Sequence, residues 1–526
     1  MRRDRGRTGL SGDGISRARV VMIHPKHCAA LLASLALCGA LFSCGGRKNQ
    51  TDALNRLERC SSEDGPLDSY CGRVEVWENR AAQTGRRIAL NVVVLPGLRR
   101  TSVADPLFFL AGGPGQGAAQ LAPQLKEAFR QVLIDRDVVL VDQRGTGKSN
   151  SLACKLAEEK EQEADLKATI ENLKDCLSGY DADPSLYTTS IAMDDLDEVR
   201  AYLGYGKINV YGGSYGARAA IAYARQHPDQ LRAVILDGVA TPDMSLPLYM
   251  ARDSQRAFSL LAGDCAADPG CNDRFPDLAG RFERLLDRLD ARPEKIRVTN
   301  PRTGEGREVR VNRPMVASIV FSALYSPETS AVLPFLITQA EAGDFQGLMA
   351  LGSLNEGALD QISLGMRYSV VCAEDAPRIA DGAIERETSG TFMDKTLAEL
   401  FLAPCKFWPR GQVPADFYEP FSIDAPALIL SGEFDPVTPP VWGEEIAMEW
   451  PGARHIVVPG AGHGTFNRGC TIQMIRQFLN EASSANLDSS CVEKLHRRPF
   501  FLGYSGPRAA GAPTTELRPG QRGTSQ

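Results

Sequence analysis

Histidine is scarce in this sequence, with only six in 526 residues, and basic residues are outnumbered by acidic ones. The formal net charge is −6 and the pI is near 5.7. Because a protein that neutralises phosphates needs a basic surface, this balance disfavours a nucleic-acid-binding protein. Hydrophobic residues make up 43% and charged residues 24%, which suits a globular protein with a sizeable core. The length indicates either several compact units or one large unit with an insertion.

Cys-x-x-Cys pairs are absent, and no histidine clusters with the cysteines, so a structural zinc site is disfavoured and we predict no metal. There are 13 cysteines, and ten remain after those of the N-terminal 44 residues. These ten form five sequence-local couples: Cys60 with Cys71, Cys154 with Cys176, Cys265 with Cys271, Cys372 with Cys405, and Cys470 with Cys491. We expect several disulfides and an oxidising compartment, although sequence alone does not determine the pairing.

No apolar run is long enough for a comfortable membrane span. The run "CAALLASLALCGALFS" follows the short basic segment "MIHPKH", which is typical of a signal peptide. We therefore predict a leader over residues 1–44, with Met22 as an alternative start. "LFSC" ends at Cys44 and resembles a lipoprotein box, so lipidation of Cys44 and ordinary cleavage both stay open. An exported protein is expected, located in the periplasm, on the cell envelope or outside a bacterium, with a lipidated Cys44 as the sole membrane attachment.

Continuous apolar runs recur along the chain, separated by helical patterns. Such runs indicate strands that are buried on both faces of a parallel sheet, and residues 73–79 and 88–96 alternate like a hairpin. The last two runs follow an insert that is much longer than one crossover needs. We predict an α/β fold in which a helical cap interrupts the sheet. Its parts are the core over 60–241 and 416–502, the cap over 242–415, and a disordered tail over 503–526.

A serine among glycines, in "VYGGSYGARAAIAYARQ", lies where a strand pattern meets an alanine-rich helical pattern. A G-x-S-x-G string alone is weak evidence, but this one has the strand–turn–helix context of a nucleophile elbow. Gly212 and Gly216 lack the Cβ atoms that would clash in so tight a turn. We predict Ser214 as a nucleophile, and the alternative is a turn that happens to contain serine.

The scarcity of histidine narrows the choice of a base. His463, in "PGAGHG", follows the last predicted strand on a glycine-rich loop. Asp435, in "SGEFDPVTPP", ends the preceding strand and completes the Ser, Asp, His order of α/β-hydrolases. We predict Ser214, Asp435 and His463 as a catalytic triad, in which the acid orients the imidazole and stabilises the imidazolium. The weaker candidates are His227, His455 and His496 for the base, and Asp237 and Glu433 for the acid.

Two glycine-rich segments are candidates for binding an anion. An oxyanion hole needs two N–H donors, which we expect from Tyr215, directly after the nucleophile, and from Gly112 or Gly113 in "AGGPG".

"DQRGTGKS" ends like a phosphate-binding loop, but Asp142 occupies the first glycine position of that motif. "GGPGQG" has Ala118 where a dinucleotide-binding motif needs its third glycine. Nucleotide binding is therefore disfavoured, and no cofactor is implied.

From about Leu90 to Leu479 the sequence resembles a known family, the α/β-hydrolase serine exopeptidases of the prolyl aminopeptidase and tripeptidyl aminopeptidase type, with a TAP-like C-terminal region. The resemblance rests on "LAGGPGQG", "DQRGTGKS", "YGGSYGARAAIAYARQHPDQLRAVILDGV", "VVCAEDAP", "LILSGEFDPVTPP" and "HIVVPGAGHG". It implies the α/β-hydrolase fold and the same triad. Ala111 departs from the histidine that prolyl aminopeptidases usually carry before these glycines, which puts strict proline specificity in doubt.

The resemblance also places "VVCAEDAP" in the cap, facing the active site. A carboxylate there would bind the free amino terminus of a peptide substrate, and we favour Glu374 over Asp375 because its arm is longer. The alternative is a solvated acidic turn before Pro377. The expected function is release of short N-terminal units from peptides. An esterase with the same triad and a non-catalytic binding protein are the competing interpretations.

Overall fold

The computed structural model describes residues 54–61, 65–99, 105–154, 166–299, 303–359 and 361–507. The predicted leader, with Met22 and Cys44, and the tail beyond residue 507 lie outside these described residues. Among the described residues, no helix combines the length and the apolar character needed to cross a bilayer.

A nine-stranded sheet organises the core, in the order β1-β2-β3-β5-β4-β6-β7-β10-β11. The first four strands in this order pair antiparallel, which includes the predicted hairpin of β2 and β3, and all later pairs are parallel. The strands are β1 (Glu58–Arg59), β2 (Tyr70–Trp77), β3 (Arg87–Leu95), β4 (Leu107–Leu110), β5 (Val138–Val141), β6 (Ile208–Gly213), β7 (Leu231–Asp237), β10 (Ala427–Gly432) and β11 (Ala453–Val458). The central strands are buried on both faces, as their continuous apolar runs predict.

Helices cover both faces of this sheet and enclose two apolar clusters. One cluster includes residues of α5 (Thr189–Leu203), α6 (Tyr215–Gln226) and α17 (Pro440–Glu449). The other includes residues of α2 (Ala122–Ala128) and α18 (Thr471–Glu481). The two-sided burial explains why the central strands β4, β5 and β10 carry almost no polar residues, and it directs functional side chains to the strand ends.

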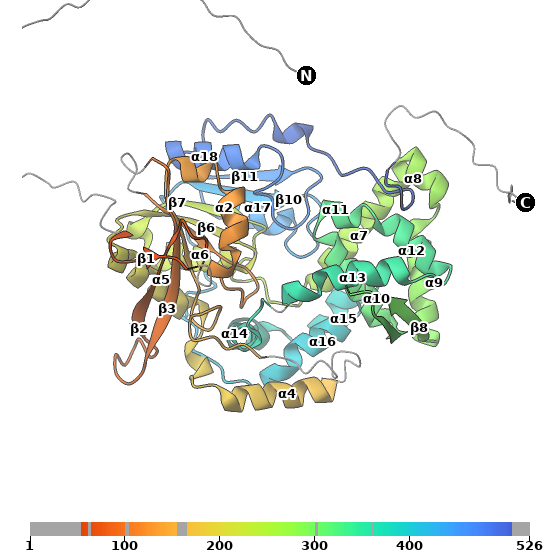
Figure 1. Cartoon of the computed structure of the whole chain (residues 1–526), viewed down its shortest axis with the longest axis horizontal. Coiled ribbons are helices and arrows are strands. Elements are labelled where there is room, and N and C mark those ends of the chain that lie inside the picture. The colour runs from red at the N-terminus through yellow and green to blue at the C-terminus, as the bar shows by residue number, and fades with distance from the viewer. Residues whose placement is uncertain are drawn as a thin grey trace, which may run out of the picture. The chain divides into compact units, whose positions relative to one another are not determined.

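A large, mainly helical insertion lies between β7 and β10 and has an apolar core of its own. Figure 1 shows its helices grouped beside the sheet. They are α7 (Met250–Ala267), α8 (Pro269–Arg274), α9 (Leu278–Ala291), α10 (Arg313–Leu324), α11 (Pro327–Ser330), α12 (Leu333–Glu341), α13 (Gln346–Leu359), α14 (Leu364–Val370), α15 (Ala383–Thr388) and α16 (Thr396–Leu402).

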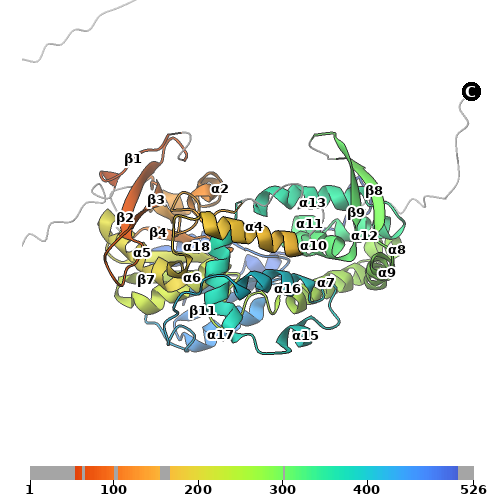
Figure 2. The same ribbon diagram turned by 90° about the horizontal axis from the view of Figure 1, so that it is seen from below.

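The insertion also contains an antiparallel hairpin of β8 (Glu294–Thr299) and β9 (Gly306–Val311), visible in Figure 2. The segment is rich in charged residues, so its sequence is also compatible with a solvated, irregular face. Its side chains are mostly exposed, so the usual apolar alternation of a half-buried strand is weak. Before the insertion, α4 (Leu166–Gly179) packs Leu173 against Tyr368 and Trp408.

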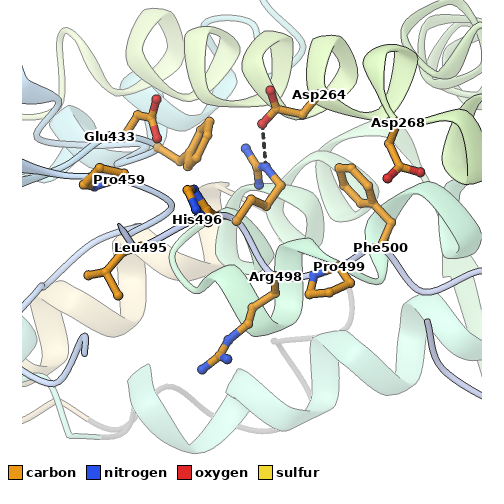
Figure 3. A pocket seen from close by; sticks show the side chains of 11 residues that line it. Asp264, Asp268, Glu433, Pro459, Leu495, His496, Arg498, Pro499 and Phe500 are labelled. Carbon is orange, nitrogen blue, oxygen red and sulfur yellow. Dashed lines mark hydrogen bonds and ion pairs between the residues drawn. The ribbon is translucent and has the colours of Figure 1, made fainter. Parts of the chain in front are cut away.

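The C-terminal segment crosses from the sheet to the insertion instead of ending on the core. Arg497 donates to Asp264 of α7 over 2.7 Å and stacks on Phe434, and Phe500 joins the apolar core of the insertion. A cavity of about 420 Å³ opens beside this crossing, lined by side chains that include Glu433 and Phe434 (Figure 3). Glu433 and Phe434 directly precede Asp435 in the sequence, but none of the predicted triad residues lines the cavity.

Disulfides join the five predicted cysteine couples, each at an S–S distance of 1.86–2.03 Å. Two of them tie down segments near the predicted cap site: Cys372–Cys405 within the insertion, and Cys154–Cys176 at the end of α4. The grouping by sequence proximity is therefore confirmed in the described residues.

Candidate active site

Ser214 occupies the tight turn between β6 and α6. Its φ of 58° and ψ of −125° lie outside the helical and extended regions, which marks a strained residue. A Cβ on Gly212 would collide with the carbonyl oxygen of Gly216, and one on Gly216 would collide with the carbonyl oxygen of Leu110. Both glycines are therefore required by the close packing of this turn, as the elbow motif predicts.

Asp435 and His463 meet at the ends of β10 and β11. His463 Nδ1 lies 2.8 Å from Asp435 Oδ2, and the other oxygen of Asp435 accepts the backbone N–H groups of Val437 and Thr438. The Thr438 hydroxyl donates to Asp435 Oδ2 over 2.8 Å. A carboxylate oxygen accepts a hydrogen bond, so Nδ1 must be the donor, and we assign the proton of the neutral imidazole to Nδ1. Nε2 is then unprotonated and can take a proton.

The charges of Asp435 and His463 shift the pKa of each group in opposite directions. Burial raises the pKa of the Asp435 carboxyl, but the combined effect of His463 and the backbone N–H donors is larger and in the opposite direction. The net pKa of Asp435 therefore lies below its ordinary value. Burial lowers the pKa of His463, whereas the charge and hydrogen bond of Asp435 raise it, and the net pKa lies above 6.5. Each group thus favours the charged form of the other.

Asp237 and Gly238 connect the serine turn to the acid–base pair. The Ser214 N–H donates to the carbonyl of Asp237 over 2.9 Å, and a Cβ on Gly238 would lie 3.3 Å from both His463 Cε1 and Asp435 Oδ2. The Asp237 carboxylate accepts the N–H of Thr465, two residues after His463. Asp237 is therefore engaged in holding the histidine loop.

Within the described residues, no hydrogen bond joins Ser214 Oγ to His463. Such bonds are often loose in unliganded hydrolases and tighten around a substrate.

The other candidate histidines and Glu433 are engaged away from Ser214. His227, at the end of α6, forms a hydrogen bond with the Asp194 carboxylate of α5. His455 forms a hydrogen bond with the Ser431 hydroxyl over 2.9 Å. His496 lines the outer cavity of Figure 3 with Glu433, which accepts the N–H of Gly460.

The predicted oxyanion loop lies directly against the nucleophile. A Cβ on Gly112 would lie 3.1 Å from Ser214 Cβ and 3.6 Å from its hydroxyl oxygen. Gly113 has a φ of +114°, a conformation that favours glycine. Tyr215 begins α6, where backbone N–H groups lack partners within the helix. The structure thus brings both predicted donor segments beside Ser214.

Glu374 and Asp375 lie in a buried network, so the solvated-turn alternative is wrong. They occupy a π-helical turn (Val371–Asp375) after α14, and both are almost fully buried. Glu374 accepts the N–H and hydroxyl of Thr189, and the Thr189 hydroxyl also bonds the Tyr215 hydroxyl over 2.6 Å. Asp375 accepts two hydrogen bonds from one guanidinium nitrogen of Arg218, at 3.0 and 3.1 Å, and a third from the Leu246 N–H.

The buried charges shift the pKa of each member of this network. Burial raises the pKa of Glu374 to about 7, although Arg218 works in the opposite direction. Burial likewise raises the pKa of Asp375. Arg218 keeps a raised pKa because both carboxylates outweigh its own burial. One guanidinium therefore serves two carboxylates beside the nucleophile helix.

Sequence reasoning missed Arg218, Thr189, Thr438 and Tyr325. Arg218 could have been found from the sequence, because a residue four positions after the nucleophile lies on the same face of the helix and therefore close to the nucleophile. Tyr325 carried none: it lies in the insertion, where its carbonyl accepts the His463 N–H over 2.8 Å and its ring packs against the imidazole. No pattern links these two segments, which are far apart in the sequence.

The "DQRGTGKS" loop is filled by its own aspartate. Asp142 accepts the N–H groups of Ala119 and Lys148, and its oxygens occupy the space beside Gly147. This carboxylate lies where a phosphate would need to bind. Among the described residues, no group of three or more His, Cys, Asp or Glu side chains is arranged to hold a metal ion.

Two parts of the chain match known protein families. Residues 105–290 match the family described as alpha/beta hydrolase fold, and residues 390–491 match the family described as TAP-like protein. The serine protease Hip1 of Mycobacterium bovis is 28% identical over 443 residues, which cover 75% of this chain and 82% of that protein. The tripeptidyl aminopeptidase of Streptomyces coelicolor is 24% identical over 466 residues, with 82% and 85% covered.

A proline iminopeptidase of Neisseria gonorrhoeae is 30% identical over 158 residues, 30% of this chain and 37% of that protein. The solved structure of the proline iminopeptidase of Mycobacterium smegmatis aligns over 78% of this chain and 98% of that one, with 17% identity and a TM-score of 0.37. The motifs, the sheet and the sequence matches together identify the chain as an enzyme of the α/β-hydrolase fold, similar to serine peptidases of the proline iminopeptidase and tripeptidyl aminopeptidase type.

Proposed function

We propose that this enzyme is an exported serine aminopeptidase that releases an amino acid, dipeptide or tripeptide from the free amino terminus of peptides. The observation that carries the proposal is the Asp435–His463 pair, 2.8 Å apart, joined through Asp237 and Gly238 to a strained Ser214. The named relatives act as peptidases, which favours peptide substrates.

In the proposed reaction, Ser214 Oγ attacks the carbonyl carbon of the scissile amide while His463 Nε2 takes the hydroxyl proton. The N–H groups of Tyr215 and of Gly112 or Gly113 stabilise the oxyanion. The C–N bond then breaks, and the imidazolium gives its proton to the leaving amine, which leaves an acyl-enzyme on Ser214. Water attacks this ester while His463 takes a proton from the water. The C–O bond to Ser214 then breaks, the imidazolium returns its proton to Ser214 Oγ, and the acid product leaves.

Glu374 is the proposed anchor for the substrate amino terminus. Each of its oxygens accepts one hydrogen bond from Thr189 and has a second lone pair. The Arg218 nitrogen that lies 3.8 Å from Glu374 donates its hydrogen bonds to Asp375, so the charge of Glu374 is only partly offset. An ammonium that bound Glu374 would stabilise its ionised form. The side chain is 1% exposed, so the surrounding side chains must move for an amine to reach it.

An esterase is the second candidate, and that same burial favours it. If Glu374 serves only to hold Thr189 and the start of α5, nothing in this network selects a free amine. The same triad and oxyanion donors would then act on esters, because the acyl-enzyme chemistry is shared by both substrate classes.

A panel of aminoacyl-, dipeptidyl- and tripeptidyl-arylamides, measured against their N-acetylated forms and against simple esters, separates the two functions. The proposal expects fast cleavage of one free-amine series and poor cleavage of its acetylated form. Glu374→Gln is expected to reduce cleavage of free-amine peptides while sparing activated esters. Equal cleavage of acetylated and free peptides would remove the amine anchor and favour the esterase or an endopeptidase.

Export is proposed from the disulfides, because five such bonds persist most readily in an oxidising compartment. Cell fractionation followed by mass determination of the mature amino terminus tests this and also distinguishes a lipidated Cys44 from ordinary leader cleavage. A cytoplasmic, uncleaved protein would contradict it.

A further inference from the structure

Arg367 on α14 is a partly buried cation without a counter-ion. Within the described part of the chain, no carboxylate pairs with its guanidinium, and its Nε is buried without a hydrogen-bond partner. The guanidinium lies over the ring of Phe401, with its carbon 5.5 Å from the ring centre. Burial lowers the pKa of Arg367, which reflects the cost of keeping this charge away from water. Unpaired buried charges are rare because that cost is large.

One side of α14 packs directly over the serine turn. Met366 and Val370 share an apolar cluster with Tyr215, the residue after the nucleophile. Just before the helix, the Ser363 N–H donates to the carbonyl of Gly115, in the loop that carries the predicted oxyanion donors. Arg367 therefore belongs to the element of the insertion that lies against the catalytic turn, between the sheet and the other insertion helices in Figure 1.

Tyr325 places Arg367 near the base as well. The Tyr325 ring meets the His463 ring edge-on, with centres 5.1 Å apart. Burial raises the pKa of the Tyr325 hydroxyl, Asp435 raises it further and Arg367 opposes the rise, so both charges lie within electrostatic range of this hydroxyl. The hydroxyl has no hydrogen-bond partner among the residues that the structure describes. Among the described residues, an unpaired guanidinium on the helix that packs against the serine turn and an unpaired phenol that packs against His463 thus lie within electrostatic range of each other.

We infer that Arg367, with the Tyr325 hydroxyl, binds a carboxylate group of the substrate and makes the enzyme selective for it. A guanidinium presents parallel N–H donors that match the two oxygens of a carboxylate, and a phenol adds a third donor. A role in packing alone would need neither an unpaired charge nor a position beside the catalytic groups. The inference rests on the proposed peptidase function, because it names the chemistry of the peptide that this function would act on.

Two parts of a peptide supply this carboxylate: the free C-terminus of a short peptide, or an acidic side chain near the scissile bond. Matched peptides of the length that the arylamide panel selects distinguish them. One pair differs only in a C-terminal carboxylate against a C-terminal amide. The second set differs only in Glu against Gln at a single position on either side of the scissile bond, with the C-terminus amidated.

We expect the wild-type enzyme to prefer the carboxylate member of at least one pair by about 10- to 100-fold in kcat/KM, the range that a charge-assisted hydrogen-bonding pair supplies. Arg367→Met is expected to abolish that preference while cleavage of the neutral member stays within a few fold. Arg367→Lys, which keeps the charge without the fork, is expected to retain part of it. Tyr325→Phe should weaken the preference less than Arg367→Met.

The matched control is Arg386→Met, which removes an exposed arginine on α15 and should leave every ratio unchanged. Equal wild-type rates on both members of every pair would overturn the inference while leaving the peptidase function intact. A uniform loss of activity on all peptides in Arg367→Met would also overturn it, because the arginine would then be structural. If Arg367→Met does not fold, the wild-type and Arg367→Lys ratios decide alone. Failure to cleave any free-amine peptide would reject the proposed function, and this inference with it.

Discussion

Replacing Arg218 with methionine tests the buried network beneath the proposed active site. Arg218 is fully buried, donates to Asp375 twice, and also donates to the carbonyl groups of Thr241 and Met244. Arg218→Met leaves Asp375 and Glu374 as uncompensated buried carboxylates. Removing one partner of such a pair costs about 3–5 kcal/mol in the free energy of unfolding.

The destabilisation should depend on pH in a defined direction. Without Arg218, burial raises the folded-state pKa of both carboxyls further above their unfolded values of 3.8 and 4.5. The folded protein then binds more protons than the unfolded chain, so stability falls as pH rises from these values through the folded-state pKa. Arg218→Met should therefore be less destabilising at pH 5 than at pH 8.

Urea denaturation of the oxidised protein at pH 5 and pH 8 measures this difference. The exposed Arg386→Met should change stability by no more than about 0.5 kcal/mol. The double variant Arg218→Met, Asp375→Leu should recover part of the loss, because an apolar pair can replace a buried ion pair. A loss below about 1 kcal/mol at pH 8, or one that is equal at both pH values, would refute the assignment of Arg218 as the counter-ion.

Ser214→Ala should abolish hydrolysis and labelling by an organophosphonate with folding retained, and persistent labelling at another serine would contradict the assignment. His463→Ala should lower kcat by about 10³- to 10⁶-fold, whereas an equally severe, folded His455→Ala would point to a different base. In the wild type, kcat/KM should rise with pH through a midpoint above 6.5, because His463 must lose its proton to act and its pKa is raised; a midpoint below 6 would contradict this. Mass spectrometry should find no alkylatable cysteine beyond Cys44 in the unreduced mature protein, and two or more would count against the five disulfides.

Much of the core could be predicted from the sequence. Each buried strand is a continuous apolar run, and it ends in a turn marked by glycine, aspartate or proline. The glycines around Ser214 and the segment after β10 mark positions where only particular residues fit, and these positions carry the candidate triad. The cysteine couples were informative for a similar reason, since short separations make pairing within each couple geometrically easy.

The insertion resisted prediction because its contacts join segments distant in sequence. Nothing local in the sequence around Tyr325 indicates contact with His463, and a charged hairpin without an apolar face resembles a loop. Glu374 could be singled out as an acidic residue near the site, but its burial could not, because Arg218 and Thr189 come from other elements. Long-range pairing of charges leaves no periodic trace in a single sequence.

The hydrogen bond from the His463 N–H to the Tyr325 carbonyl bears on how this enzyme could change its substrates. The insertion leaves the sheet after β7 and returns to it before β10, so in principle it can be exchanged as one unit. Here the cap contributes backbone to the support of the base, so a transplanted cap must supply a carbonyl at the same place. A graft that matches the new substrate but lacks this carbonyl would bind its peptide well and turn it over slowly. Substrate choice and catalytic competence are therefore coupled in this architecture.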